Sequence, residues 1–291
     1  MTLQLGWFST GRDEAARNLL MEIWKRKDIG QLDVEIPFVF SNREPGEGPG
    51  TKEGPEREKF YKMVNDLGMD LITLSHLKVE PALRKMGLAE TDDFANPSHA
   101  LLEWRNVYGE RVIEAIEAAG HSPDVCIMAG YMLIWSPTEC QTWDAINLHP
   151  ALPWGPTGTW QEVIWKIMAL DETEQGVMMH LVTPELDRGP PVAYCRFPLT
   201  GEGWDKLWAE DKERGTSWIM MNQGESNPLF RKIRAEGERR ELPLIAHTVG
   251  ELAEGRLEIR DKWPYISGHK VEKGADLSDI VEIELLGDGG G

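Results

Sequence analysis

The sequence predicts an α/β fold in which a mostly parallel central sheet carries helices on both faces. Short apolar runs that are typical of buried strands alternate with longer segments of helical periodicity along the chain. At 291 residues the chain is long enough for one large domain with a substantial core. Folds of this class bind ligands at the carboxyl ends of their strands, so functional residues are expected there.

The individual elements follow from hydrophobic periodicity and from the residues that interrupt it. Apolar runs bounded by turn residues indicate strands, and apolar residues repeated every three to four positions indicate helices. Residues 45–55 are rich in Gly and Pro and indicate a loop, whereas residues 75–96 form a longer stretch without an assigned role. Strands are expected at 3–8, 34–40, 70–74, 125–129, 177–183, 192–199 and 255–259, and helices at 14–24, 56–67, 97–119, 160–170, 204–219 and 228–254.

The turn after the first strand has the pattern of an anion site. Its small residues lead directly into a helix, whose first backbone N–H groups can hold a phosphate. Asp13 and Glu14 oppose this role unless they point away or cap the helix, and Arg12 can compensate for their charge. Phosphate binding by Gly11, Arg12 and Asp13 and a plain turn with acidic caps are therefore both open interpretations.

The domain organisation is expected to be simple. A single domain covers residues 1–275 with insertions near 45–55, 75–96 and 215–235. The segment 276–291 ends in three glycines and is expected to be a flexible tail. No internal repeat is visible.

Charge and cysteine usage limit the function classes. The chain has 49 acidic and 31 basic residues, for a formal charge of −18, which disfavours a nucleic-acid partner. It has neither an apolar leader nor a run of about 18 apolar residues, so we expect no membrane association and a cytoplasmic location. The three cysteines lack metal-ligand spacing and are expected to be reduced core residues.

The segment 146–191 contains the side chains best suited to proton and oxyanion chemistry. Asn147 and His149 are two apart in a stretch that Pro150 keeps extended, so they share one face. Asp187 lies in a turn, 184–190, between two strand-like runs, where a carboxylate can point into a cleft. The alternative for Asn147 and His149 is a strand end whose polar groups satisfy loop backbone.

At these residues the chain resembles the folate-dependent formyltransferases, most closely their glycinamide ribonucleotide formyltransferase branch. That family has an Asn-x-His-Pro motif at the end of a central strand, followed later by a His and, seven residues on, by an Asp in a Leu-Asp-x-Gly-Pro turn. The corresponding residues here are Asn147, His149, His180 and Asp187, the last within 186–190. The resemblance implies a Rossmann-like formyltransferase fold, 10-formyltetrahydrofolate as co-substrate without a metal, and formyl transfer to a small primary amine. The implied acceptor is glycinamide ribonucleotide, a phosphorylated intermediate of purine biosynthesis.

The resemblance also assigns binding residues. An Arg followed by an aromatic residue precedes the strand entry at 123–124, and an Ala-Gly-aromatic-Met-x-Ile segment follows that strand. Two departures, acidic residues near position 13 and an altered loop at 151–161, put the acceptor in doubt more than the reaction. The implied cofactor-binding residues are Arg105, Tyr131, Met132, Leu133, Ile134, Val182 and Glu185, and the implied substrate-binding residues are Gly11, Arg12, Asp13 and Glu238.

Formyl transfer passes through a tetrahedral intermediate, and the catalytic candidates suit it. Asn147 and a protonated His149 can donate to its oxyanion, and Asp187 can accept the proton of the amine and hold His149 in its charged form. His180 lies about 23 Å from Asp187 along a fully extended chain, and nearer if the turn folds back, so it is not assumed to be a direct partner and is expected to pack or to act indirectly. A metal site is disfavoured because the two histidines and Asp187 lack compact ligand spacing.

Three other functions stay open. The acceptor can be an amino sugar, the reaction can be hydrolysis of 10-formyltetrahydrofolate, or the chain can be a folate- or nucleotide-binding module without catalysis. A methionyl-tRNA formyltransferase is excluded because residues 200–291 are acidic and contain no basic RNA-binding domain. The sequence does not determine the oligomeric state, and a homodimer is one open alternative.

Overall fold

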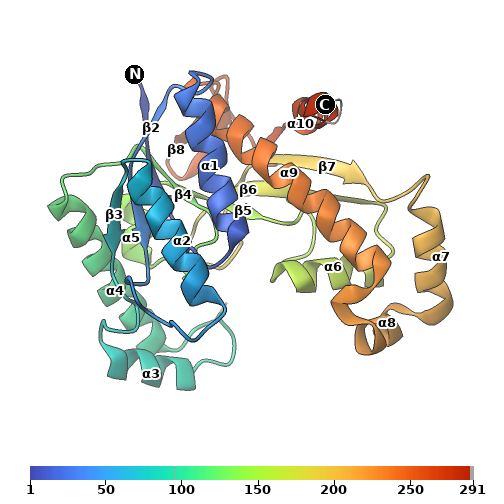
Figure 1. Cartoon of the computed structure of the whole chain (residues 1–291), viewed down its shortest axis with the longest axis horizontal. Helices are drawn as coiled ribbons and strands as arrows, with labels where there is room; N and C mark the ends of the chain where they lie inside the picture. Colours follow the sequence, from blue (N-terminus) through green and yellow to red (C-terminus); the bar gives the residue numbers. More distant parts are fainter. Residues whose placement is uncertain (95, 289–291) are drawn as a thin grey trace.

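The structure is a computed structural model of the chain, and it describes residues 1–94 and 96–288. An eight-stranded sheet runs through the described part of the chain, in the order β11-β7-β6-β5-β4-β1-β2-β3. Helices cover both of its faces (Figure 1). The predicted α/β class with a mostly parallel sheet is therefore confirmed. The strands are β1 (Leu3–Phe8), β2 (Val34–Ser41), β3 (Asp70–Thr73), β4 (Val125–Met128), β5 (Ala145–His149), β6 (Glu174–Leu181), β7 (Pro191–Pro198), β8 (Leu257–Arg260), β9 (Trp263–Ile266), β10 (His269–Lys270) and β11 (Ala275–Asp276).

The strand directions place the functional edge of the sheet. β3, β2, β1, β4 and β5 are parallel, so their carboxyl ends meet at one edge. β6 and β7 continue the sheet as an antiparallel hairpin beside β5. β8, β9 and β10 form a separate small antiparallel sheet.

Two apolar layers hold the helices against the sheet. On one face the inward residues of the strands pack with α1, α2 and α9, through side chains such as Leu20, Phe60 and Val249. On the other face Phe8, Phe38 and neighbouring residues pack with α4. The described helices are α1 (Glu14–Asp28), α2 (Glu53–Asp66), α3 (Pro81–Ala89), α4 (His99–Ala118), α5 (Pro137–Thr142), α6 (Trp160–Ala169), α7 (Asp205–Arg214), α8 (Thr216–Asn222), η1 (Gly224–Ser226), α9 (Pro228–Ala253) and α10 (Ser278–Asp288).

Two segments differ from the expected helices. Within 75–96, where no structure was assigned, α3 packs on α4 so closely that a Cβ on Gly87 would lie 2.5 Å from the backbone nitrogen of Leu101. The single helix predicted at 204–219 is broken into α7 and α8 at Gly215, whose φ of +81° interrupts the helix.

The expectation of a flexible tail from residue 276 is wrong for the described residues up to 288. β11 pairs with β7, and α10 packs on α9 with Val281 fully buried. The terminal glycines suggested loose chain, whereas the apolar residues before them cover the edge of the sheet. Residues 289–291 of the predicted tail lie outside the described residues. In the part of the chain described here, no helix combines the length and the apolar character needed to cross a membrane.

Candidate active site

Asn147 and His180 face each other across two antiparallel strands. The register of β5 and β6 sets Asn147 directly opposite His180, and the Asn147 Nδ2 atom lies 3.2 Å from His180 Nε2. This contact agrees with an indirect role for His180, which acts on the orientation of Asn147. Pairing between strands brought together two residues that are 33 positions apart.

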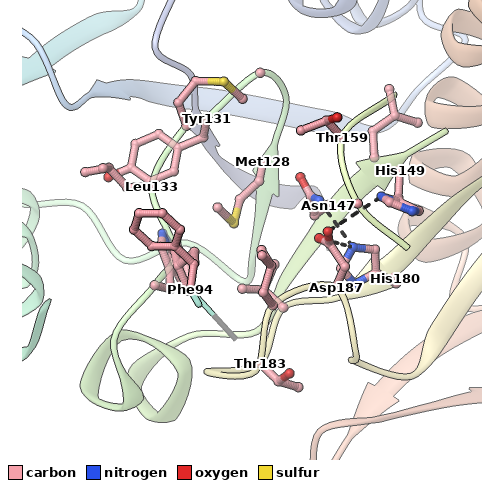
Figure 2. Close-up of a pocket in the computed structure, with 18 of the residues that line it drawn as sticks. Phe94, Met128, Tyr131, Leu133, Asn147, His149, Thr159, His180, Thr183 and Asp187 are labelled. Carbon is pink, nitrogen blue, oxygen red and sulfur yellow. Dashed lines mark hydrogen bonds and ion pairs between the residues drawn. The ribbon is translucent and has the colours of Figure 1, made fainter. Parts of the chain in front are cut away.

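The hairpin tip between β6 and β7 folds back and returns Asp187 to the same place. Asp187 has a φ of +53°, in the left-handed region that Asp tolerates better than most residues. Its carboxylate lies 3.9 Å from His149 Nδ1 and 3.7 Å from His180 Nε2 (Figure 2). The distance along an extended chain therefore overestimated the separation of the two residues, because His180 contacts Asp187 across the turn.

Gly189 allows this tip to close. The Leu181 N–H donates to the carbonyl of Pro190 at 2.8 Å, which seals the base of the turn. A Cβ on Gly189 would lie 1.7 Å from the Leu181 carbonyl oxygen, so a larger residue does not fit. The Gly in the Leu-Asp-x-Gly-Pro turn is thus required by the close approach of two backbone segments.

Burial keeps His180 neutral. Removal from solvent and, to a smaller extent, the nearby His149 together lower the pKa of His180 to about 4, although the Leu181 carbonyl and Asp187 oppose the shift. His180 Nδ1 is 2.9 Å from the Leu181 carbonyl oxygen and is assigned as the protonated nitrogen, because a carbonyl only accepts. His180 Nε2 then accepts a hydrogen bond from the Asn147 amide, which fixes the orientation of that amide.

Burial also favours the neutral form of His149. Burial lowers the pKa of His149, and this effect outweighs Asp187 and the Pro156 carbonyl, which both favour the charged form. Its Nε2 atom is buried without a hydrogen-bond partner in the described structure. Desolvation of the ring therefore opposes the charged form of His149 that Asp187 favours.

These groups lie at one end of a cavity of about 630 Å³. Residues 131–134, which follow β4, line its other side, and Val182 completes the wall (Figure 2). Five predicted cofactor-binding residues therefore line the cavity: Tyr131, Met132, Leu133, Ile134 and Val182. The remaining two are absent from the lining of the described cavity. Glu185 is exposed, and Arg105 is buried in α4, where desolvation lowers its pKa.

Several lining residues escaped the sequence interpretation. Phe94 comes from the stretch without an assigned role and carries no sequence signal for a site. Thr159 and Glu162 form a capping box at the start of α6, and this Thr-x-x-Glu pattern before a helical segment could have indicated them. Asp92, Met128, Thr183 and Leu186 also line the cavity.

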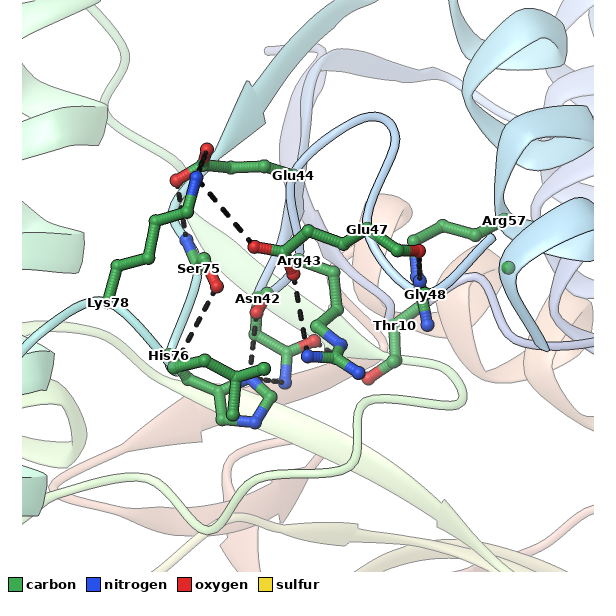
Figure 3. Close-up of polar contacts among 12 residues, drawn as sticks. Thr10, Asn42, Arg43, Glu44, Glu47, Gly48, Arg57, Ser75, His76 and Lys78 are labelled. Atoms are coloured by element: carbon green, nitrogen blue, oxygen red, sulfur yellow. Dashed lines mark hydrogen bonds and ion pairs between the residues drawn. The ribbon is translucent and has the colours of Figure 1, made fainter. Parts of the chain in front are cut away.

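A buried polar network fixes the backbone of the cavity wall. Thr10 Oγ1 accepts from the Met132 N–H at 3.0 Å and donates to Asn42 Oδ1 at 2.9 Å. The Asn42 carbonyl in turn lies 2.8 Å from His76 Nδ1, and the buried Arg57 donates to the Thr10 carbonyl at 3.2 Å (Figure 3). Three loops that follow β1, β2 and β3 are thus joined behind the cavity.

The four predicted substrate-binding residues are placed near α1 and α9, and none of them lines the described cavity. Gly11 has a φ of +64°, and a Cβ there would meet the Phe60 ring at 2.8 Å. Arg12 pairs with Asp13 at 3.4 Å, and Asp13 caps α1. Glu238 is exposed on α9 and pairs with Arg234 at 2.8 Å.

Comparison with known proteins supports the resemblance that the motifs indicate. The model of the family described as formyl transferase matches residues 14–203. The chain is 30% identical over 108 residues to the phosphoribosylglycinamide formyltransferase of Escherichia coli K12, which is 36% of this chain and 49% of that protein. The corresponding enzyme of Haemophilus influenzae is 23% identical over 154 residues, 52% of this chain and 59% of that protein. The chain thus spans about half to three fifths of the length of the curated relatives that it matches.

Solved structures share the fold at low sequence identity. The phosphoribosylglycinamide formyltransferase of Coxiella burnetii superposes with a TM-score of 0.60 at 17% identity, covering 95% of this chain and 99% of that one. A formyltetrahydrofolate deformylase of Pseudomonas putida KT2440 gives a TM-score of 0.54 at 17% identity, covering 91% and 70%. Because the family model covers more than half of its residues, the chain belongs to the formyl transferase family.

Proposed function

We propose that this chain is an enzyme that transfers the formyl group of 10-formyltetrahydrofolate to a primary amine. The observation that supports this most strongly is the convergence of Asn147, His149 and Asp187 at one end of a ligand-sized cavity. The family match gives the same chemistry independently. Glycinamide ribonucleotide, the acceptor indicated by the names of the relatives, is the first acceptor to assay.

The cavity suits a folate in both size and lining. Its volume lies within the roughly 300–1,000 Å³ that is usual for small-molecule sites. Met128, Leu133 and Val182 offer apolar surface, and Asn147, Thr159 and Thr183 add polar groups to the same lining. A flat ring system with polar edges is the ligand shape that such a lining accepts.

Asn147 is suited to stabilise the tetrahedral intermediate. The amine nitrogen forms a bond to the formyl carbon, and the carbonyl oxygen becomes an oxyanion. One N–H of the Asn147 amide donates to His180, and its second N–H has no partner among the described residues. This N–H is available to the oxyanion, a contribution typically of about 3 kcal/mol per donor.

His149 and Asp187 are suited to handle the protons. The attacking nitrogen becomes positively charged and must lose a proton, which Asp187 can accept directly or through a water. The neutral His149 carries one ring N–H, which can donate to the oxyanion. The ring also supports the transfer of a proton to N10, the leaving nitrogen. Collapse then breaks the bond between the formyl carbon and N10, and tetrahydrofolate leaves with a proton on N10.

The test is formyl transfer from 10-formyltetrahydrofolate with and without glycinamide ribonucleotide, followed by absorbance of the released folate and mass of the product. Acceptor-dependent release of folate with a formylated amine supports the proposal. Asn147→Ala should lower the rate by about 100-fold or more. Glu114→Gln, an exposed change on α4 away from the cavity, is the matched control and should retain full activity.

Hydrolysis of the same folate is the second candidate function. Deformylases are among the similar folds, and an acid–base pair such as His149 and Asp187 can also activate a water. Folate and formate released at equal rates with and without any amine would establish hydrolysis in place of transfer.

A further inference from the structure

The first turn of α1 is already occupied by carboxylates of the chain itself. A helix that starts at the carboxyl end of a strand normally offers free N–H groups to an anion. Here Asp13 Oδ1 accepts from the Ala16 N–H at 3.0 Å and caps the helix. Glu14 adds a second carboxylate in the same turn. An incoming phosphate would therefore meet negative charge and would have to displace a built-in cap.

Three guanidinium groups near this turn are already paired. Arg17 on α1 pairs with Glu56 at 2.6 Å and donates to the Asp13 carbonyl at 3.4 Å. Arg12 faces Asp13 at 3.4 Å. Arg234 on α9 binds Glu238 at 2.8 Å and Glu241 at 2.9 Å. Five carboxylates, counting Glu14, therefore surround three cations, and each cation has a carboxylate partner before any substrate arrives.

The turn after β1 lies at the same edge of the sheet as the cavity. β4 separates β1 from β5, so this turn and Asn147 emerge at that edge one strand apart. The Thr10 N–H donates to the Gly130 carbonyl at 3.0 Å, and Gly130 lines the cavity. The helix that follows this turn, α1, also packs along α9 (Figure 1).

Arg234 connects this acidic surface to the cavity rim. Its guanidinium lies 4.6 Å from the centre of the Trp160 ring, and Trp160 directly follows Thr159 of the cavity lining. Burial is the main cause that raises the pKa of Glu241, Arg234 opposes it, and the negative charges of Glu238 and Asp13 add to the rise. The carboxylates of α1 and α9 thus act on one shared region.

We infer that the amine acceptor of this chain carries no phosphate where it meets the start of α1, and that it presents hydroxyl or ammonium groups there instead. Carboxylates accept hydrogen bonds from hydroxyl and ammonium groups and repel a phosphate. An unphosphorylated amino sugar or a similar hydroxyl-rich amine has this chemistry. The inference rests on the proposed function and concerns only its acceptor.

Two matched pairs of amines test it, each differing by one phosphate: glycinamide ribonucleotide with glycinamide riboside, and glucosamine 6-phosphate with glucosamine. Formylation by the full chain is measured as kcat/KM for each amine with saturating 10-formyltetrahydrofolate. We expect the unphosphorylated member to be preferred by about tenfold or more, since repulsion between like charges near a protein surface has this magnitude. Added salt should reduce the preference by screening.

Asp13→Asn isolates the charge from the cap. Asn caps a helix as well as Asp does, so α1 should persist while one negative charge is lost. In this variant, the ratio of kcat/KM for the unphosphorylated amine to that for the phosphorylated amine should fall by several-fold. Asp66→Asn removes an equally negative residue from the opposite end of α2, where Asp66 pairs with Lys62, and should leave the preference unchanged.

The outcomes separate this inference from the proposed function. Equal use of both members, or preference for the phosphorylated one, overturns the inference and leaves formyl transfer intact. Failure to formylate any of the four amines, with or without release of formate, overturns the proposed function and the inference with it.

Discussion

Replacing Gly189 with alanine tests whether the shape of the hairpin tip places Asp187. A Cβ at this position would lie 1.7 Å from the Leu181 carbonyl oxygen, whereas non-bonded atoms need more than about 3 Å. The obstructing atom belongs to the backbone of the sheet and cannot rotate away. The tip must therefore move by more than about 1 Å, which can lower turnover by about 100-fold. We also expect a loss of about 1–3 kcal/mol in the free energy of unfolding.

The assay compares turnover and denaturant unfolding of Gly189→Ala with those of Gly50→Ala. A Cβ on Gly50 would meet no described atom within 4 Å, so this variant should match the parent chain in both measurements. If displacement of Asp187 is the cause, the double variant Asp187→Ala with Gly189→Ala should lose no more turnover than Asp187→Ala alone. Unchanged turnover of Gly189→Ala, or a fully additive loss in the double variant, would refute this reasoning.

Three further outcomes are expected. His149→Asn should lower kcat by about 100-fold or more with little change in folate affinity. A binding module without catalysis would show the same folate affinity in both proteins and no formyl transfer in either. Steady-state kinetics and folate titration distinguish the two functions. His180 has a pKa of about 4 in the folded protein, against an ordinary value of 6.5. As the pH falls, the unfolded chain therefore binds this proton first. The free energy of unfolding should fall between pH 6.5 and pH 4, and it should be about 2 kcal/mol lower at pH 5 than at pH 7. His180→Gln should remove that part of the slope in denaturant unfolding at pH 7 and pH 5, and an unchanged slope would contradict the assignment. Thr10→Val removes the hydroxyl that joins Met132 to Asn42 and should raise KM for the folate about tenfold with a smaller effect on kcat, whereas an unaltered KM would show that the network does not shape the cavity wall.

The positions of several strands were predictable because their signals are local. The apolar runs of β1, β2 and β4 are largely buried in the sheet, and such runs are short and distinct in sequence. The C-terminal helix α10 was missed, because its burial depends on the edge of a sheet built from residues far away in the chain. The three terminal glycines favoured the prediction of a loose tail, although the segment before them contains apolar residues such as Val281.

The site was predictable in part. Asn147, His149 and Asp187 were identified by motif, and the structure brings them together. The separation of His180 from Asp187 was overestimated, because the sequence does not show how far the turn folds back. The contacts of His180 with both Asn147 and Asp187 depend on strand register and on the closure at Gly189.

The amino-acid sequence alone was sufficient for the α/β class, for the order of the chemistry-bearing residues along the central strands and for the family, since periodicity and short motifs are properties of neighbouring residues. The protonation of the two histidines and the charge around α1 became visible only in the folded chain. Protonation depends on how much water is excluded from His149 and His180. The charge balance depends on which carboxylates of α9 reach Arg234 near Asp13, and packing between helices that are distant in sequence sets those neighbours.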